Sequence, residues 1–173
     1  DLRLTDNQLT GEIPSEISSL IYLHNLLLEH NQLDGQIPQE IGALTNLLQL
    51  GLSYNILEGN IPAEIGSLAS LEFLNLANNQ LSGSIPDELS ALSSLLVLKL
   101  ENNQLSSIPE SICNLGIDFS SYASFSIHNN LLCPPYPDCV DGNEGEQNTE
   151  NCISCTEGEV GLWGECYNIE ETT

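Results

Sequence analysis

The chain has 173 residues, of which 25 are acidic and only two are basic, giving a formal net charge of −23 at pH 7. This charge argues strongly against nucleic-acid binding, because phosphates are bound by clusters of Lys and Arg. It also disfavours anionic membrane surfaces. No apolar run approaches the roughly 18 residues of a membrane span, so none is expected.

A ten-residue motif, which first appears as LRLTDNQLTG, occurs five times at intervals of 24 residues. A period between about 20 and 50 residues indicates one supersecondary unit copied along an axis, so we predict a solenoid. A degenerate sixth copy follows 27 residues after the fifth. Each copy holds an asparagine at the same place: Asn7, Asn31, Asn55, Asn79, Asn103 and Asn130.

Each copy predicts a strand, a turn and a short helical segment. In the second copy Leu26 and Leu28 alternate with exposed positions, as in a strand with one buried face. Gly35 follows where the chain must bend, and Ile-Pro then fixes an extended segment. Ile41 and Leu44 are three residues apart, as one helical turn needs to bury a single face.

The recurring asparagine is the polar exception in this apolar frame. Its amide can both donate and accept hydrogen bonds, so it can pair with the free backbone groups of the turn and of neighbouring copies. We predict that all six asparagines are structural, and we assign them no binding role.

The pattern LxLxxNxLxGxIPxEIGxL closely resembles the plant-type class of leucine-rich repeat over about residues 1–132. The resemblance implies an α/β solenoid with a parallel sheet on the concave side and 3₁₀ or irregular turns on the convex side. It also implies a second short extended segment after the turn. Residues 1–132 would then hold five regular copies and the degenerate sixth.

Six cysteines lie in the last third of the chain: Cys113, Cys133, Cys139, Cys152, Cys155 and Cys166. The even count indicates disulfides, and therefore an oxidising, extracellular compartment. Residues 133–152 resemble the cysteine-bearing C-terminal caps of secreted leucine-rich repeat proteins. By this analogy we favour Cys113–Cys133 and Cys139–Cys152, although four cysteines allow three pairings.

Residues 153–173 are similar to the N-terminal cap of a following repeat stack. When Thr173 is placed before Asp1, Cys166 and Ile169 fall 14 and 11 residues before Asn7, at apolar positions of the repeat. Such cysteine-bracketed segments resemble those that precede repeats in bacterial secreted surface proteins, which implies a Cys155–Cys166 bridge and a core covered by Trp163. We hypothesise a tandem or head-to-tail, end-to-end assembly.

Residues that flank the strand leucines are expected on the concave face, the usual binding surface of the resembled family. Leu27, His30, Tyr54 and Phe73 on adjacent copies predict a mixed aromatic patch of the kind found in recognition surfaces. Ordinary surface decoration is the alternative. The candidate binding residues are Leu27, His30, Gln49, Tyr54, Phe73, Asn78, Lys99, Glu101 and His128.

Catalysis and metal binding receive little support. Glu101 and His128 are predicted neighbours near Lys99, which suggests a base and its orienting partner, but no nucleophile accompanies them. Cys152-x-x-Cys155 lacks the second pair of a zinc site. One segment offers clustered oxygen ligands that could hold Ca²⁺, but it lacks the full spacing of a twelve-residue calcium loop. We therefore prefer to interpret it as a solvated acidic loop. The Ca²⁺ candidates are Asp141, Asn143, Glu144 and Glu146.

The sequence therefore predicts a non-catalytic module, extracellular or on a cell surface, that needs no cofactor. Its concave sheet would bind a protein or a glycan, as in adhesion. The alternative is a structural subunit of a surface array or filament, in which the stack itself is the function.

Overall fold

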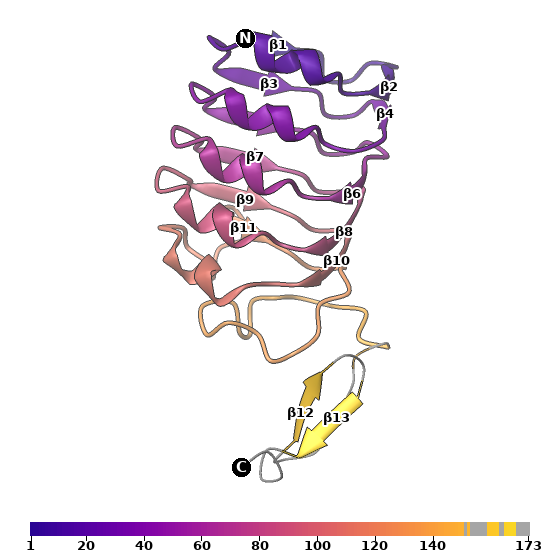
Figure 1. The fold of residues 1–173 in the computed structure, drawn as a ribbon, viewed down its shortest axis with the longest axis vertical. Helices are drawn as coiled ribbons and strands as arrows, with labels where there is room; N and C mark the ends of the chain where they lie inside the picture. The colour runs from indigo at the N-terminus through magenta and orange to yellow at the C-terminus, as the bar shows by residue number, and fades with distance from the viewer. Residues whose placement is uncertain (151, 153–158, 163–164, 169–173) are drawn as a thin grey trace.

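The computed structural model describes residues 1–150, 152, 159–162 and 165–168, and it confirms the predicted solenoid. Successive coils are stacked along one axis, each with a strand on one side and a short helical turn on the other (Figure 1). One strand from each coil joins a parallel six-stranded sheet, which we call the main sheet. In spatial order its strands are β1 (Leu2–Arg3), β3 (Asn25–Leu27), β5 (Gln49–Gly51), β7 (Phe73–Asn75), β9 (Val97–Lys99) and β11 (Phe125–Ser126).

A second set of short parallel strands follows the turn in each coil, in two sheets that we call the side sheets. One pairs β2 (Thr10–Glu12) with β4 (Gln32–Asp34), and the other orders β6 (Glu58–Asn60), β8 (Gln80–Ser84) and β10 (Gln104–Ser107). A single bridge between Gln36 and Glu58 joins them. The extended segment that the repeat pattern implied is therefore present.

The helical turns are 3₁₀ helices of five residues, each preceded by the proline of the Ile-Pro pair. They are η1 (Ser15–Ser19), η2 (Gln39–Ala43), η3 (Ala63–Ser67), η4 (Asp87–Ala91) and η5 (Glu110–Asn114). The proline before η1 has φ −70° and ψ 142°, an extended conformation that ends the side strand and starts the turn. None of the helical segments in the described part of the chain could cross a bilayer.

The core is a ladder of apolar side chains in register from coil to coil. Leu26 pairs with Leu50, Leu50 with Leu74 and Leu74 with Leu98, and all four are fully buried. The apolar residue of each 3₁₀ turn, such as Ile41 or Ile65, closes the same core from the opposite side. Each coil therefore buries its apolar face mainly against its two neighbours.

The asparagines run through this core as a hydrogen-bonded ladder. Asn55 Nδ2 lies 3.0 Å from the carbonyl oxygens of Leu28 in the previous coil and Leu52 in its own, and its Oδ1 accepts a hydrogen bond from Leu33 N–H at 3.0 Å. The same links recur at Asn31, Asn79, Asn103 and Asn130. Each of these five asparagines thus joins two adjacent coils, whereas Asn7, within the described residues, donates only to Leu4 and Thr5 of its own coil.

The predicted pairing of the cap cysteines is wrong. The disulfides are Cys113–Cys139 and Cys133–Cys152, with Cα–Cα distances of 5.6 and 5.5 Å, instead of Cys113–Cys133 and Cys139–Cys152. Cys113 lies in η5, on the helical side of the stack. Cys133 lies two residues after Leu131, whose N–H donates to the Leu105 carbonyl in β10. This bond places Cys133 on the side of the coil that carries the side sheets. Cys113 and Cys133, which follow one another in the order of cysteines, therefore lie on different sides of the coil and cannot pair.

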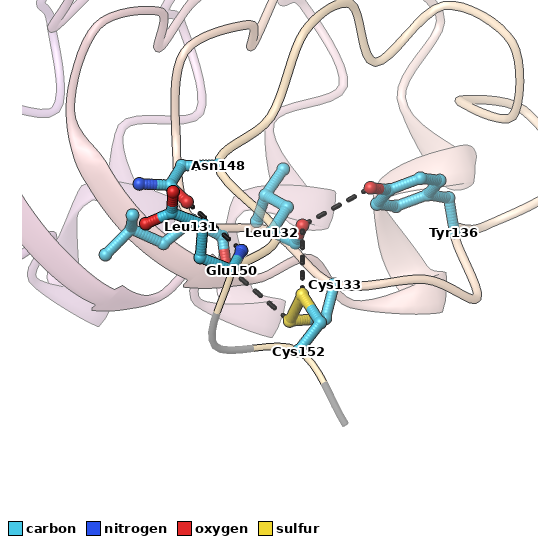
Figure 2. Close-up of a disulfide and its surroundings, with 7 residues drawn as sticks. All are labelled: Leu131, Leu132, Cys133, Tyr136, Asn148, Glu150 and Cys152. Carbon is cyan, nitrogen blue, oxygen red and sulfur yellow. Dashed lines mark hydrogen bonds between the residues drawn. A yellow bond between two sulfur atoms is a disulfide. The ribbon is translucent and has the colours of Figure 1, made fainter. Parts of the chain in front are cut away.

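The cap closes the last coil by returning twice across it. Val140, next to Cys139, is fully buried in the core, and Asn148 N–H donates to the Asn130 carbonyl. This second return brings Cys152 to Cys133, beside the Leu132 carbonyl that accepts a hydrogen bond from the Tyr136 hydroxyl (Figure 2). The C-terminal end of the stack is thus covered by the cap.

Beyond the cap, β12 (Glu159–Leu162) and β13 (Glu165–Asn168) form an antiparallel hairpin. The predicted Cys155–Cys166 bridge and the predicted roles of Trp163 and Ile169 lie outside the described residues. They remain predictions.

Candidate functional site

The surface of the main sheet is organised in rows that run across the coils. One row lies at the start of the strands, where Gln49 pairs with Asn25 on one side and Phe73 on the other, and Phe73 pairs with Val97. Gln49 and Phe73 are half-buried. This row is the first part of the predicted binding face.

A second row lies just beyond the strand ends, and every residue in it is left-handed. Its φ angles are 55° or 56° in all six coils: Asp6, His30, Tyr54, Asn78, Asn102 and Asn129. This conformation is uncommon outside glycine, and Asn, Asp and His adopt it more readily than other residues. Five of the six residues are of those three types, and Tyr54 is the exception.

His30 and Tyr54 form a stacked aromatic pair in this row. Their ring centroids are 4.3 Å apart with an interplanar angle of 10°, and Tyr54 is 50% exposed. The other side of His30 faces Asp6, with 4.0 Å between Nδ1 and Oδ1. The row therefore presents a carboxylate, an imidazole and a phenol side by side on three consecutive coils.

Glu29 lies between the two rows, and sequence reasoning did not select it. Its carboxylate accepts a hydrogen bond from the Thr5 hydroxyl at 2.9 Å and lies over Gly51, where an added Cβ would collide with it. Glycine at residue 51 leaves room for the carboxylate in this position, and a larger residue there would displace it. The sequence did contain a signal for this contact: Gly51 is the glycine in a row of equivalent strand positions whose other members carry side chains, Arg3, Leu27, Asn75 and Lys99.

The predicted aromatic patch is resolved into separate groups. Phe73 and Gln49 lie at the strand starts, whereas His30 and Tyr54 lie beyond the strand ends, and Leu27, half-buried in β3, pairs with Gly51 between them. A partner would therefore need to cross the width of the sheet to contact both rows.

The candidate residues nearer the cap have partners that the sequence did not reveal. His128 Nδ1 lies 3.0 Å from the hydroxyl of Ser126, which is 3% exposed, and Lys99 Nζ donates to the Tyr122 carbonyl. The Oε2 atom of Glu101 is buried without a hydrogen-bond partner among the described residues. Within the same part of the chain, no ion pair joins Glu101 to His128, so the suggested base and orienting partner are not assembled.

The acidic loop of the cap is used for packing. Gly145 lies so close to His128 that an added Cβ would be 2.6 Å from the His128 Cβ, and Gln147 Nε2 donates to the carbonyls of Ile127 and Glu144. Across the described residues, no three His, Cys, Asp or Glu side chains are grouped to share a metal ion. The Ca²⁺ candidates Asp141, Asn143 and Glu146 are exposed.

Two open grooves, of about 490 and 540 Å³, lie beside the side sheets. They lie between successive coils and share Gln36 and Pro38; Glu40 and Glu64 line the first, and Glu12 and Glu58 are among the residues of the second. A comparable groove occurs at neighbouring coils, so we attribute both grooves to the regular spacing of the coils.

Comparison with protein families gives a match to the model described as Leucine Rich Repeat. The match covers residues 1–20, 22–44, 70–92 and 94–115, just over half of the chain. A comparison with curated protein sequences found no match.

Solved structures of plant proteins share the fold. The peptide hormone receptor RGFR1 in complex with RGF2 is 35% identical, with a TM-score of 0.74 over 84% of this chain. The Arabidopsis thaliana receptor kinase ectodomain GASSHO1/SCHENGEN3 in complex with CASPARIAN STRIP INTEGRITY FACTOR 2 is 38% identical, with a TM-score of 0.70 over 82% of this chain. This chain spans only 24% and 17% of their respective lengths.

The Arabidopsis thaliana BIR3–SERK2 complex offers a match of more similar size. It is 40% identical over 80% of this chain and 72% of that chain, with a TM-score of 0.65.

Proposed function

Because the chain belongs to the leucine-rich repeat family, we propose that it is a non-catalytic, extracellular protein-binding module whose partner lies on the main sheet. The two disulfides of the cap support an oxidising compartment. Among the similar structures, RGFR1 is a peptide hormone receptor in complex with RGF2, and the GASSHO1/SCHENGEN3 ectodomain is in complex with CASPARIAN STRIP INTEGRITY FACTOR 2. This likeness supports a peptide or protein partner here.

The observation that carries the proposal is the His30–Tyr54 stack. A tyrosine at φ 55° is strained by an amount on the order of 1 kcal/mol or more, and the same position holds asparagine in three other coils. The stack does not bury Tyr54, which stays half exposed. An exposed aromatic pair kept at a conformational cost is typical of a recognition surface.

The carboxylates near the stacked pair favour a basic partner. Asp6 lies 4.0 Å from His30, and Glu29 precedes His30 in the chain; both basic residues of the chain, Arg3 and Lys99, lie in β1 and β9. One cationic group of a partner could stack on the Tyr54 ring, and a second could pair with the Asp6 carboxylate beside His30. We therefore propose an Arg- or Lys-containing segment as the bound element.

Tyr54→Asn tests this function, because asparagine fits the left-handed backbone and removes only the aromatic face. A display library of basic and charge-neutral peptides is first screened on the wild-type chain, with a glycan array as the second arm. The best ligand should bind Tyr54→Asn at least about tenfold more weakly, as expected when a central aromatic contact is lost. Tyr22→Asn, at an 81% exposed position away from the sheet, is the matched control.

Unchanged affinity in Tyr54→Asn would place the binding surface elsewhere. Hits confined to glycans would replace the peptide partner with a carbohydrate, which also stacks on aromatic rings.

A further inference from the structure

The coils are copies of one pattern, so each exposed position can be compared along the stack. In the five regular copies, the residue after the ladder asparagine is glutamine except in the third: Gln8, Gln32, Ile56, Gln80 and Gln104. Ile56 is 47% exposed, so packing in the core does not explain it. The residue before the same asparagine is Tyr54, which the left-handed backbone disfavours. The third coil therefore departs from the pattern at two exposed positions that flank one asparagine.

These two residues begin a line of exposed side chains that follows the third coil. Asn55 and Leu57 are buried, whereas Tyr54, Ile56 and Glu58 are exposed. Alternation of this kind is that of an extended segment with one buried face, and it continues into β6, which begins at Glu58. We call Tyr54, Ile56 and Glu58 the third-coil line. It presents an aromatic ring, an aliphatic side chain and a carboxylate, from the end of the main sheet to the side sheet.

Carboxylates border Ile56 on two sides. Gln36 of the second coil pairs with Glu58. Two residues earlier in the same register, Asp34 lies opposite Ile56, whose N–H donates to the Leu33 carbonyl at 2.9 Å. Asp34 and Glu58 are both exposed, and among the described residues neither takes part in an ion pair. An apolar contact at Ile56 is thus bordered by two carboxylates that a basic partner could reach.

The third-coil line ends beside one of the open grooves. Glu58 is among the residues that line the groove of about 540 Å³, together with Glu12 and Glu16. A chain that passed from Tyr54 over Ile56 to Glu58 would therefore continue into a space with acidic walls. This charge favours basic residues in that part of a partner as well.

Spacing distinguishes a partner that follows one coil from a partner that crosses many coils. Alternate side chains of an extended segment are about 6.8 Å apart, both in the partner and in the coil itself. Strands of neighbouring coils are only about 4.8 Å apart. An extended segment that lies along the third coil therefore keeps its side chains in step with the line, whereas one that runs across the coils loses this match.

We propose that the bound segment is extended and crosses the third coil from the main sheet onto the side sheet. At alternate positions it carries a basic, an aliphatic and a second basic side chain. The first stacks on Tyr54, the second packs on Ile56, and the third pairs with Glu58. The inference rests on the proposed function, and it adds Ile56 and Glu58 as residues that determine specificity.

Two displayed peptide libraries test the spacing. One fixes the order Arg-Ser-Leu-Ser-Lys, which places the basic and aliphatic side chains at alternate positions. The other fixes Arg-Leu-Ser-Ser-Lys, which has the same composition but turns the leucine to the opposite face of an extended chain. Both libraries carry the same randomised flanks. The wild-type chain should enrich the first library at least about tenfold over the second.

Variants of the third coil test the contacts of the best enriched peptide. Ile56→Gln should weaken its binding about tenfold, and glutamine suits the backbone because neighbouring coils hold it at this position. The double variant Ile56→Gln/Gln80→Ile moves the aliphatic side chain to the next coil, away from Tyr54 and Glu58, and should not restore affinity. Glu58→Gln should weaken binding and reduce its salt dependence. Gln104→Ala, exposed in the fifth coil, is the matched control and should change nothing.

The outcomes separate this path from the proposed function. If Tyr54→Asn weakens the peptide but Ile56→Gln and Glu58→Gln do not, the path is refuted and the main-sheet function stands. Equal enrichment of the two libraries would refute the alternating spacing. Recovery of affinity in Ile56→Gln/Gln80→Ile would show an apolar contact without a fixed place. If Tyr54→Asn also leaves affinity unchanged, both proposals are refuted. Urea unfolding establishes that each variant is folded.

Discussion

The asparagine ladder predicts that the same substitution has different costs in different coils. Asn55→Ala removes an amide that is 8% exposed and links coils two and three. Asn7→Ala removes an exposed amide that donates only within its own coil. The sequence contexts are alike, so the difference between the two variants measures the inter-coil hydrogen bonds.

The magnitude follows from the number of hydrogen bonds. The two amide hydrogens of Asn55 serve acceptors at 3.0 Å, 3.0 Å and 3.3 Å, and its oxygen accepts from Leu33 N–H at 3.0 Å, so three full hydrogen bonds are possible at once. At about 1 kcal/mol each, with their partners left unpaired in the core, Asn55→Ala should cost about 3 kcal/mol. Asn7→Ala should cost under about 1 kcal/mol, because water replaces its bonds.

Urea unfolding followed by circular dichroism measures both changes in unfolding free energy. Hydrogen exchange at Leu33 N–H provides a local readout, since Asn55→Ala should accelerate it while Asn7→Ala should not. Equal losses in the two variants would refute the inter-coil role, as would a cost below about 1 kcal/mol for Asn55→Ala.

Two further predictions concern packing and pH. Gly66→Ala should destabilise by about 2 kcal/mol more than Gly51→Ala in the same urea assay, because its Cβ meets the backbone of Glu88 whereas Gly51 faces only the movable Glu29 carboxylate; equal costs would contradict this reasoning. Burial, and secondarily the Glu144 charge, raise the pKa of Tyr136 above 10.0, so the unfolded chain loses this proton first. Stability should therefore fall as pH rises from about 10 to the raised value, and Tyr136→Phe should remove that part of the decline in unfolding free energy.

The sequence was sufficient for the fold because its information is periodic. Leu26, Asn31, Gly35 and Ile41 each recur with the period of the coil, and each occupies in the structure the position that its chemistry requires. Because five regular copies and a degenerate sixth show the same pattern, one irregular copy does not change the predicted fold.

The disulfides could not be predicted in the same way, because the cap has no repeat. Which cysteines meet depends on how the chain returns across the last coil, and Val140 and Asn148 fix those two returns through burial and a backbone hydrogen bond. Neither contact leaves a spacing signal. The Ser126–His128 hydrogen bond was missed for a related reason, since nothing in the spacing distinguished Ser126 from an ordinary core-flanking residue.

The second row of the main sheet, in which every residue is left-handed, shows what a periodic sequence can and cannot reveal about function. The pattern marks the residue before each asparagine as variable, but it does not show that this residue is left-handed in every coil. Once that is known, Asp6, His30 and the three asparagines are explained by the backbone alone. Tyr54 is not, because the backbone disfavours it and the solvent reaches half of it. A residue that a repeat position selects against for structural reasons is best explained by contact with another molecule, and for this reason the proposed binding surface is centred on Tyr54.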